Sequence, residues 1–312
     1  MLKFHNKHKT ARASSASTRP QADDALPWEL DPHERIMILA PHPDDEVLAA
    51  GGVIATALKL RNQIRVVVVT NGDASYATAL SQGSHFITRK NFQHQAVMRQ
   101  QESLKALSSL GLNAHHIHFW GFPDRGLASL WNAPWDNGDP YRSSTTGYNS
   151  SIQALNSPVL HFTGANLDEL FRNELLEFYP TTVIMPHPRD NHSDHSALAG
   201  FTLRAVRDYY YQAHLPSPKL LAYWIWQTDI PFLTGAQPDN LAHTYLEVDP
   251  AKIVDQRLRL SPEIREQKMC ALRCYPSQKI PAGKIFHAVS KKTCEIFTVL
   301  QPTFEARNLA GA

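Results

Sequence analysis

The sequence predicts an α/β fold with a mostly parallel sheet and helices on both faces. Short, continuous apolar runs of the length of buried strands alternate with longer segments that have helical spacing. Polar clusters follow several of these runs directly, as active-site loops follow the carboxyl ends of parallel strands. Together these observations indicate a Rossmann-like sheet.

The first strand is expected at residues 36–40, an apolar run that Pro41 and Pro43 end because proline cannot continue a strand. A helix is expected over 47–60. The polar residues His42, Asp44, Asp45 and Glu46 stand between the two elements. In an open parallel sheet this is where an active site forms.

The later elements continue the alternation of strand and helix. We expect strands at 64–69, 117–120, 181–185, 220–226 and 244–248, and helices at 91–110, 166–178 and 196–213. Ser261 and Pro262 form an N-cap and first-turn pair, which predicts a helix to about Cys274. Residues 284–300 are expected to be partly helical, with no predicted place against the sheet.

Composition excludes several classes of protein. The chain of 312 residues is 43% hydrophobic and 19% charged, which is ordinary for a globular protein. No apolar run approaches the ~20 residues that cross a bilayer. The net charge of +2 includes five basic residues within 1–21, so the other residues carry 26 basic against 29 acidic groups. A mildly acidic body argues against a nucleic-acid-binding domain.

We expect a disordered basic tail over 1–27, followed by a single domain over 28–305 with an inserted loop at about 127–165. The tail lacks the apolar segment of a signal peptide, and the three cysteines suit a reducing, cytoplasmic environment. The inserted loop has little periodicity and is typical of a binding loop or lid. Its aromatic residues, Trp131, Trp135 and Tyr141, could stack on a sugar ring or fix the loop to the protein body.

The first polar cluster has the ligand types of a divalent metal site. His42 and Asp45 are three residues apart and can curl around one ion, and imidazole with carboxylate suits zinc. Asp44 and Asp45 are neighbours that point in different directions, so one can bind metal while the other faces the metal-bound water. The alternative is a proline-rich turn with an aspartate that caps the next helix.

A second polar cluster, residues 186–195, follows the strand expected at 181–185. His192 and His195 are three apart, so a helical turn places them on one face, and His195 can supply a third protein ligand. Asp194 can orient a ring nitrogen of a nearby histidine. His187 could compete for these roles, but its position within Pro-His-Pro favours a loop residue.

The two clusters together resemble the LmbE/PIG-L family of metal-dependent N-deacetylases. Residues 40–46, Ala-Pro-His-Pro-Asp-Asp-Glu, resemble the family's Ala-His-Pro-Asp-Asp-Glu motif with Pro41 inserted. Residues 192–195, His-Ser-Asp-His, resemble its His-Pro-Asp-His motif with Ser193 in place of proline. Shorter matches lie at 70–73, 99–102, 121–124, 268–272 and 277–278, so that the resemblance runs from about 34 to 280.

The resemblance implies roles for eight residues. The metal ligands would be His42, Asp45 and His195. Asp44 would be the general base, protonated His192 would stabilise the oxyanion, and Asp194 would orient His192. Arg99 would bind the substrate sugar, and Asp124 would either contact the substrate or support the metal ligands. From spacing alone, Arg99 and Glu102 are more typical of a solvated surface pair. Some members carry a tyrosine two positions before the first histidine of the second motif, where this chain has Asp190.

The function that the resemblance implies is zinc-dependent removal of the N-acetyl group from an N-acetylglucosamine-type conjugate, with a metal-bound water as the nucleophile. The substrate would be a small-molecule or lipid-linked amino sugar. A His/Asp/His site could also hold Fe²⁺ or Co²⁺ in place of Zn²⁺. The alternatives are an amidase or esterase that acts on another acyl group and a catalytically inactive sugar-binding protein. The sequence leaves the oligomeric state open.

Overall fold

A computed structural model describes residues 25–81, 86–133, 135, 138–213, 216–226 and 254–301. Residues 1–24 of the expected tail and the expected strand at 244–248 lie outside the described residues.

The described strands form one eight-stranded sheet in the order β1-β7-β8-β6-β5-β2-β3-β4. The five strands β4, β3, β2, β5 and β6 run parallel to one another, whereas β8 is antiparallel to both β6 and β7. The predicted mixed α/β, mostly parallel sheet is therefore confirmed. Its strands are β1 Leu26–Pro27, β2 Arg35–Ala40, β3 Gln63–Thr70, β4 Ile117–Phe122, β5 Thr182–Pro186, β6 Lys219–Tyr223, β7 Val254–Arg259 and β8 Cys294–Leu300.

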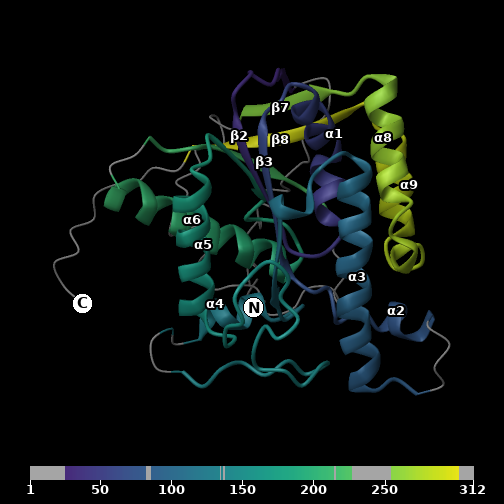
Figure 1. Ribbon diagram of the computed structural model, residues 1–312, viewed down its shortest axis with the longest axis vertical. Helices are drawn as coiled ribbons and strands as arrows, with labels where there is room; N and C mark the ends of the chain where they lie inside the picture. The colour runs from purple at the N-terminus through teal and green to yellow at the C-terminus, as the bar shows by residue number, and fades with distance from the viewer. Residues whose placement is uncertain are drawn as a thin grey trace, which may run out of the picture.

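Helices cover both faces of the sheet. Figure 1 shows α1, α3, α8 and α9 on one side and α4, α5 and α6 on the other. The helices are α1 Asp45–Lys59, α2 Tyr76–Ser81, α3 Arg89–Ser109, α4 Leu127–Asn132, α5 Gly164–Phe178, α6 Ser193–Ala213, α8 Pro262–Leu272 and α9 Gly283–Ser290. In the part of the chain that the structure describes, none of them is long and apolar enough to cross a membrane.

Strand β2 shows why the central strands have no polar alternation. Ile36 and Ile38 face the hydrophobic core that includes residues of α1 and α3, while Met37 and Leu39 face the core that includes residues of α5 and α6. All four side chains are fully buried. Because each face of the sheet is covered by helices, both sides of the strand must be apolar.

The C-terminal part of the sheet differs from the expectation. Residues 294–300 form β8, and only 283–290 are helical, as α9. Strand β7 was not expected either, since its residues Val-Asp-Gln-Arg-Leu-Arg form no apolar run and are mostly only half-buried. A strand near the edge of a sheet does not need a continuous apolar run, so its pattern is weak.

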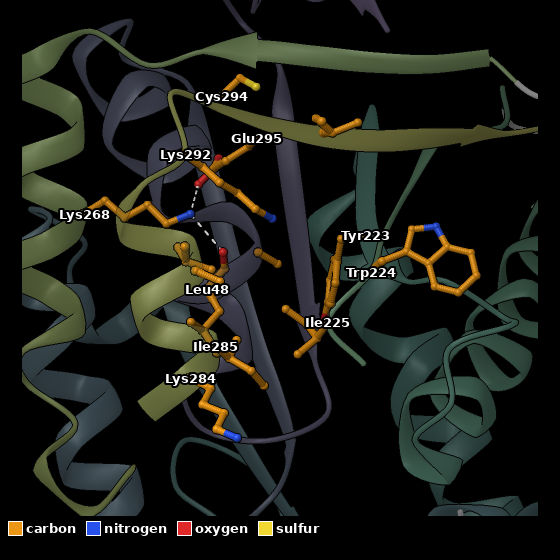
Figure 2. Close-up of a pocket in the computed structure, with 14 residues that line it drawn as sticks. Leu48, Tyr223, Trp224, Ile225, Lys268, Lys284, Ile285, Lys292, Cys294 and Glu295 are labelled. Carbon is orange, nitrogen blue, oxygen red and sulfur yellow. Dashed lines mark hydrogen bonds and ion pairs between the residues drawn. The ribbon is translucent and has the colours of Figure 1, made fainter. Parts of the chain in front are cut away.

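Helix α1 is broken at Ala50, where φ is −133°. Glu295 of β8 accepts hydrogen bonds from the backbone N–H groups of Gly52 and Val53, at 2.7 and 2.8 Å. Lys268 of α8 forms an ion pair with Glu295 and donates to the carbonyl oxygen of Leu48, at 2.9 Å (Figure 2). These contacts satisfy the backbone groups that the break leaves without helical partners.

The order of the central strands fixes the position of the site. Strands β3 and β4 follow β2 toward one edge of the sheet, whereas β5 and β6 lie on the other side of β2, toward the opposite edge. The boundary between β2 and β5 is therefore the topological switch point, where ligands bind at the carboxyl ends of the strands. Both polar clusters follow these two strands directly.

Candidate metal centre and active site

The loop after β2 turns sharply at Asp44, which has a φ of +120° and precedes α1 as its N-cap. A positive φ is rare for a residue with a Cβ and costs on the order of 1–3 kcal/mol. The Asp44 side chain is buried, at 5% exposure. The surrounding structure therefore holds this carboxylate in a conformation that the chain would not adopt by itself.

Three predicted metal ligands meet beside this turn. The Nδ1 atom of His42 lies 3.0 Å from Oδ2 of Asp45, and Nε2 of His195 lies 3.2 Å from the same oxygen. All three residues are buried, and their ligand atoms lie within 4.8 Å of one another. Two ligand atoms of a tetrahedral zinc site are separated by roughly 3.4 Å, so the observed spacing is close to what a metal requires.

Each of the two histidines also has a carboxylate at its other ring nitrogen. Oxygens of Asp194 and Asp124 lie 3.2 and 3.3 Å from Nε2 of His42. An oxygen of Asp190 lies 3.4 Å from Nδ1 of His195. Metal-binding histidines characteristically donate their second N–H to such a group, which fixes the tautomer and the ring orientation.

The electrostatics of these histidines fit a divalent cation. Burial lowers the pKa of His195, but the charges of Asp190 and Asp45 outweigh burial and raise it to about 9. In His42, the carboxylates of Asp124, Asp194 and Asp45 likewise overcome burial and raise the pKa well above its usual value. Among the described residues neither ring nitrogen of His195 finds a hydrogen-bond partner of good geometry. The buried His/Asp triad is a divalent metal site in its chemistry and spacing.

His42 also belongs to a second cluster of candidate ligands, with His192 and Asp194. The oxygens of Asp194 already accept hydrogen bonds from the backbone N–H groups of Arg125 and Leu127, at 2.6 and 3.1 Å. Nδ1 of His192 accepts one from the backbone N–H of Asp194, at 3.2 Å. Because these atoms are satisfied, the His42, Asp45 and His195 group suits a metal better.

The hydrogen bond to His192 Nδ1 favours a neutral ring with its proton on Nε2. Burial lowers the pKa of His192 to about 4, and the nearby rings of His42 and His195, when charged, act in the same direction. This differs from the protonated imidazole expected from the sequence. The Asp194 carboxylate contacts His42, while it is the Asp194 backbone that contacts His192.

Arg99 lies beside Asp44 and is buried, at 4% exposure. Its Nη2 lies 3.3 Å from Oδ1 of Asp44 and donates to the carbonyl oxygen of Pro43, while Nη1 donates to that of Gly72. A Cβ on Gly72, whose φ is +62°, would lie 2.0 Å from Arg99 Nη1. The interpretation of Arg99 and Glu102 as a solvated pair is wrong, because both are buried and Glu102 binds Ser277.

The pKa of Asp44 is raised well above its ordinary value by burial, which the positive charge of Arg99 opposes. This carboxylate therefore binds a proton more readily than an exposed aspartate does. Asp44 thus combines a strained backbone, a guanidinium partner and a raised pKa, features that are concentrated at functional sites.

Glu46 has a different place from its neighbours in the motif. It is fully buried and accepts hydrogen bonds from the Tyr275 hydroxyl, at 2.6 Å, from the Ser103 hydroxyl and from the backbone N–H of Asp44. It therefore braces the loop from within and links it to α3 and to the segment after α8.

Two further carboxylates were not predicted as site residues. Asp73 accepts a hydrogen bond from the backbone N–H of Asp124, at 3.2 Å, and burial raises its pKa to about 7. Asp190 accepts hydrogen bonds from the backbone N–H groups of His192, Ile225 and Trp226, at 3.0, 3.1 and 3.1 Å. In the sequence Asp190 stood out only as the position of a missing tyrosine, and its placement by β6 could not be read from local spacing.

A cavity of about 380 Å³ opens over these groups. Six predicted site residues line it: His42, Asp44, Asp45, Arg99, Asp124 and His192. The other two, Asp194 and His195, are fully buried, at 0% exposure. The walls include Leu48, Ala74, Tyr76, Ile225, Trp226, Gln278 and Ile285. The structure therefore brings all eight predicted residues to one place.

The aromatic residues of the inserted loop pack against α6. The Trp135 ring stacks on Phe201 at 5.1 Å between centroids, and Trp131 meets Phe201 edge-on at 5.0 Å. The guanidinium of Arg204 lies 4.4 Å from the Trp135 centroid. These two tryptophans therefore fix the loop to the body. His187 stacks on Trp224, as a loop residue outside the metal ligands.

Comparisons with known proteins agree with this geometry. The family model of the GlcNAc-PI de-N-acetylases, PIG-L, matches residues 37–206, more than half of the chain. No curated protein sequence matches the chain.

Several solved structures share the fold. A deacetylase (triple mutant) of the teicoplanin biosynthetic pathway is 16% identical, with 87% of this chain and 100% of that one covered and a TM-score of 0.56. The A40926 pseudoaglycone deacetylase is 18% identical, with 86% and 98% covered and a TM-score of 0.55. A conserved protein from Thermus thermophilus is 19% identical, with 87% and 97% covered and a TM-score of 0.51.

The structures establish the shared fold, and the family model covers both polar clusters together with the strands that carry them. The chain belongs to the PIG-L/LmbE family of metal-dependent de-N-acetylases.

Proposed function

We propose that the protein is a zinc-dependent hydrolase that removes the N-acetyl group from an N-acetylglucosamine-type conjugate. The observation that carries the proposal is a cavity lined by two members of a buried His/Asp/His triad, by a strained aspartate and by a neutral histidine. The membership of a de-N-acetylase family supports the reaction type. The cavity volume of about 380 Å³ is within the range of small-molecule sites.

In this proposal His42, Asp45 and His195 hold the metal. A bound zinc ion would supply Lewis acidity and a water of lowered pKa at the scissile carbonyl. Asp194 and Asp190 keep the two histidines in the tautomers that leave Nδ1 of His42 and Nε2 of His195 for the ion.

Asp44 acts as the general base that accepts the proton of the attacking water. Its carboxylate is adjacent to the ligand Asp45 and lines the cavity. The backbone of Asp44 is held by Glu46, and Arg99 holds its Oδ1 atom. Fixed in this way, the base needs little reorganisation to meet the proton. The proton then passes to the leaving amine.

His192 stabilises the oxyanion that develops on the acetyl carbonyl. Its Nδ1 atom accepts the Asp194 N–H, so the Nε2–H is the donor left for the substrate. A fixed N–H donor of this kind in a buried site typically contributes about 10²–10³ in turnover. Arg99 and Asp124, which also line the cavity, are proposed to contact the sugar.

The test is acetate release from a panel of N-acetylglucosamine conjugates by zinc-loaded protein, with an Asp44→Asn variant as the partner. We expect acetate from the wild type, a loss of at least about 10²-fold in the variant, and the same zinc content in both. A wild type that binds one zinc per chain and releases no acetate from any conjugate would refute the substrate class. Release of a different acyl group would favour the amidase or esterase alternative.

A further inference from the structure

Helix α1 contains two segments that meet at the break at Ala50. The first segment, residues 45–49, begins with the predicted metal ligand Asp45 and directly follows the predicted base, Asp44. The second segment comprises residues 51–59. Because a break interrupts the hydrogen bonds that make a helix rigid, the second segment does not by itself fix the direction of the first. The positions of Asp44 and Asp45 therefore depend on the other contacts of the first segment.

The end of the first segment borders two cavities. Leu48 lines the cavity of about 380 Å³ over the metal triad and also another cavity, of about 200 Å³, which Figure 2 shows. Ala49 lines this other cavity too. A side chain at the border of a cavity has fewer packing partners than one in a close-packed core. Packing therefore supports the end of the first segment less firmly than it supports the buried strands.

A buried ion pair bridges the break. In an unbroken helix the N–H of Gly52 would donate to the carbonyl oxygen of Leu48. Here Lys268 of α8 donates to that carbonyl oxygen, at 2.9 Å, and Glu295 of β8 accepts from the N–H of Gly52, at 2.7 Å. Lys268 and Glu295 also pair with each other, and Figure 2 shows the Lys268 ammonium between the Glu295 carboxylate and Leu48. The pair thus connects the end of one segment to the start of the next.

The signs of the two charges match the two helix ends. The cation lies at the carboxyl end of the first segment and the carboxylate at the amino end of the second, which is the stabilising arrangement at each end. Two glycines make room for the pair. A Cβ on Gly51 would lie 3.1 Å from Cγ of Lys268, and one on Gly52 would lie 3.0 Å from the carboxyl carbon of Glu295. A side chain at either position would therefore press on the pair.

We propose that Lys268 and Glu295 are positioning residues of the active site, which hold the first segment of α1 in the direction that presents Asp45 to the metal and Asp44 to the attacking water. The inference rests on the proposed function and adds two residues to it. Glu46 fixes the start of the segment, and Lys268 fixes its end. The described residues that line the cavity over the triad do not include Lys268 or Glu295, so the pair acts through the backbone of α1.

Two variants separate positioning from stability. Lys268→Met removes the donor and leaves the buried Glu295 carboxylate without its cation, so the protein should be destabilised. Lys268→Met combined with Glu295→Gln removes both charges. Much of the stability should then return, because neutral replacements of a buried ion pair are often tolerated. The carbonyl oxygen of Leu48 still lacks its ammonium donor in this double variant, so the direction of the segment should remain altered.

The test measures kcat and KM for acetate release, the zinc dissociation constant of the metal-free protein and the unfolding midpoint. We expect the double variant to lose about 10–100-fold in kcat, with KM within about two-fold of the wild type. Its zinc dissociation constant should rise at least about ten-fold, because Asp45 moves with the segment. The matched control is Arg65→Met with Glu174→Gln, which neutralises a buried ion pair between β3 and α5. The control should change neither kcat nor zinc affinity by more than about two-fold.

A folded double variant with the kcat and zinc affinity of the wild type would overturn the inference, since the pair would then serve stability alone. Glu295→Gln by itself is a milder variant, in case the double variant does not fold. It keeps an acceptor oxygen and loses the charge, so kcat and zinc affinity should each fall by about five-fold, and unchanged values would again overturn the inference.

The zinc measurement also separates this inference from the proposed function. If the wild type releases no acetate from any conjugate, the proposed reaction fails, but the zinc dissociation constants still test the positioning. A rise of at least about ten-fold in the double variant, with none in the control, then supports the role of Lys268 and Glu295. Equal constants in all three proteins refute it.

Discussion

Replacement of Asp190 by asparagine is a direct test of how the metal triad is held. The Asp190 carboxylate is buried, at 2% exposure; it accepts hydrogen bonds from three backbone N–H groups, and one of its oxygens lies 3.4 Å from Nδ1 of His195. An asparagine has one acceptor oxygen and one donor amide, so it cannot accept from all three backbone N–H groups and also present an oxygen to His195. The side-chain N–H of the asparagine must then face one of the N–H groups that now point to the carboxylate.

The magnitude follows from these contacts. The charge of Asp190, 3.4 Å from Nδ1 of His195, favours a proton on that nitrogen and so leaves Nε2 for the metal. The substitution removes this charge. Loss of such an outer carboxylate typically weakens metal binding by about 10–100-fold. We therefore expect the zinc dissociation constant of Asp190→Asn to rise by this factor, with a KM increase because Ile225 and Trp226 line the substrate cavity.

The assay is competition for zinc between a chromophoric chelator and the metal-free protein. The matched control is Asp168→Asn, which alters another buried carboxylate, at 5% exposure, that pairs with Arg172 and Arg204. The control should bind zinc within about two-fold of the wild type, since its residue has no contact with a ligand. An Asp190→Asn protein that is folded and binds zinc as tightly as the wild type would show that Asp190 does not position His195.

Three other predictions concern the site and its support. His192→Ala should lose about 10²–10³ in turnover and still bind one zinc, which metal analysis beside acetate release will measure; unchanged turnover would contradict its role. Because the pKa of His195 is about 9 and that of His42 is also raised, both rings are protonated at pH 7 without metal and must lose a proton to bind it. Calorimetry in buffers of different ionisation enthalpy should therefore show the release of close to two protons when zinc binds. The zinc affinity should fall as the pH is lowered. Lys268→Ala leaves the buried Glu295 without its cation and should lower the free energy of unfolding by about 3–5 kcal/mol, or the melting temperature by roughly 10 °C. Lys59→Ala removes one member of an exposed pair with Glu263 and should lower the free energy of unfolding by at most about 1 kcal/mol.

The central sheet could be predicted because burial on both faces leaves a continuous apolar run. Strands β2, β3, β4 and β5 each have such a run, and the helices between them have clear spacing. Strands β7 and β8 were not predicted because their sequences lack this uninterrupted apolar pattern. They lie toward an edge and carry charged residues such as Asp255 and Glu295, which find partners in Thr298 and Lys268.

That His42 and Asp45 lie together could be predicted, because a short spacing along the chain keeps the two residues close in any turn or helical conformation. The partners of the ligands could not, since Asp190 meets Ile225 only when β5 and β6 pair. Arg99 shows the same limit. Its spacing from Glu102 suggested a surface pair, and only the packing of α3 against the loop after β2 reveals that its charge is directed to Asp44.

The balance of buried charge gives an independent argument for the metal. Five aspartates and one glutamate lie together below 9% exposure around the triad: Asp44, Asp45, Glu46, Asp73, Asp190 and Asp194. Against them, the buried permanent cation among the residues that line the cavity is Arg99, which pairs with Asp44. Without metal, the protein offsets the remaining charge by raising the pKa values of its own groups, as His42, His195 and Asp73 do. A divalent ion at the triad would reverse this tendency, because its charge favours neutral histidines and ionised aspartates. The surplus of carboxylates is thus what makes the ion and the folded site mutually stabilising.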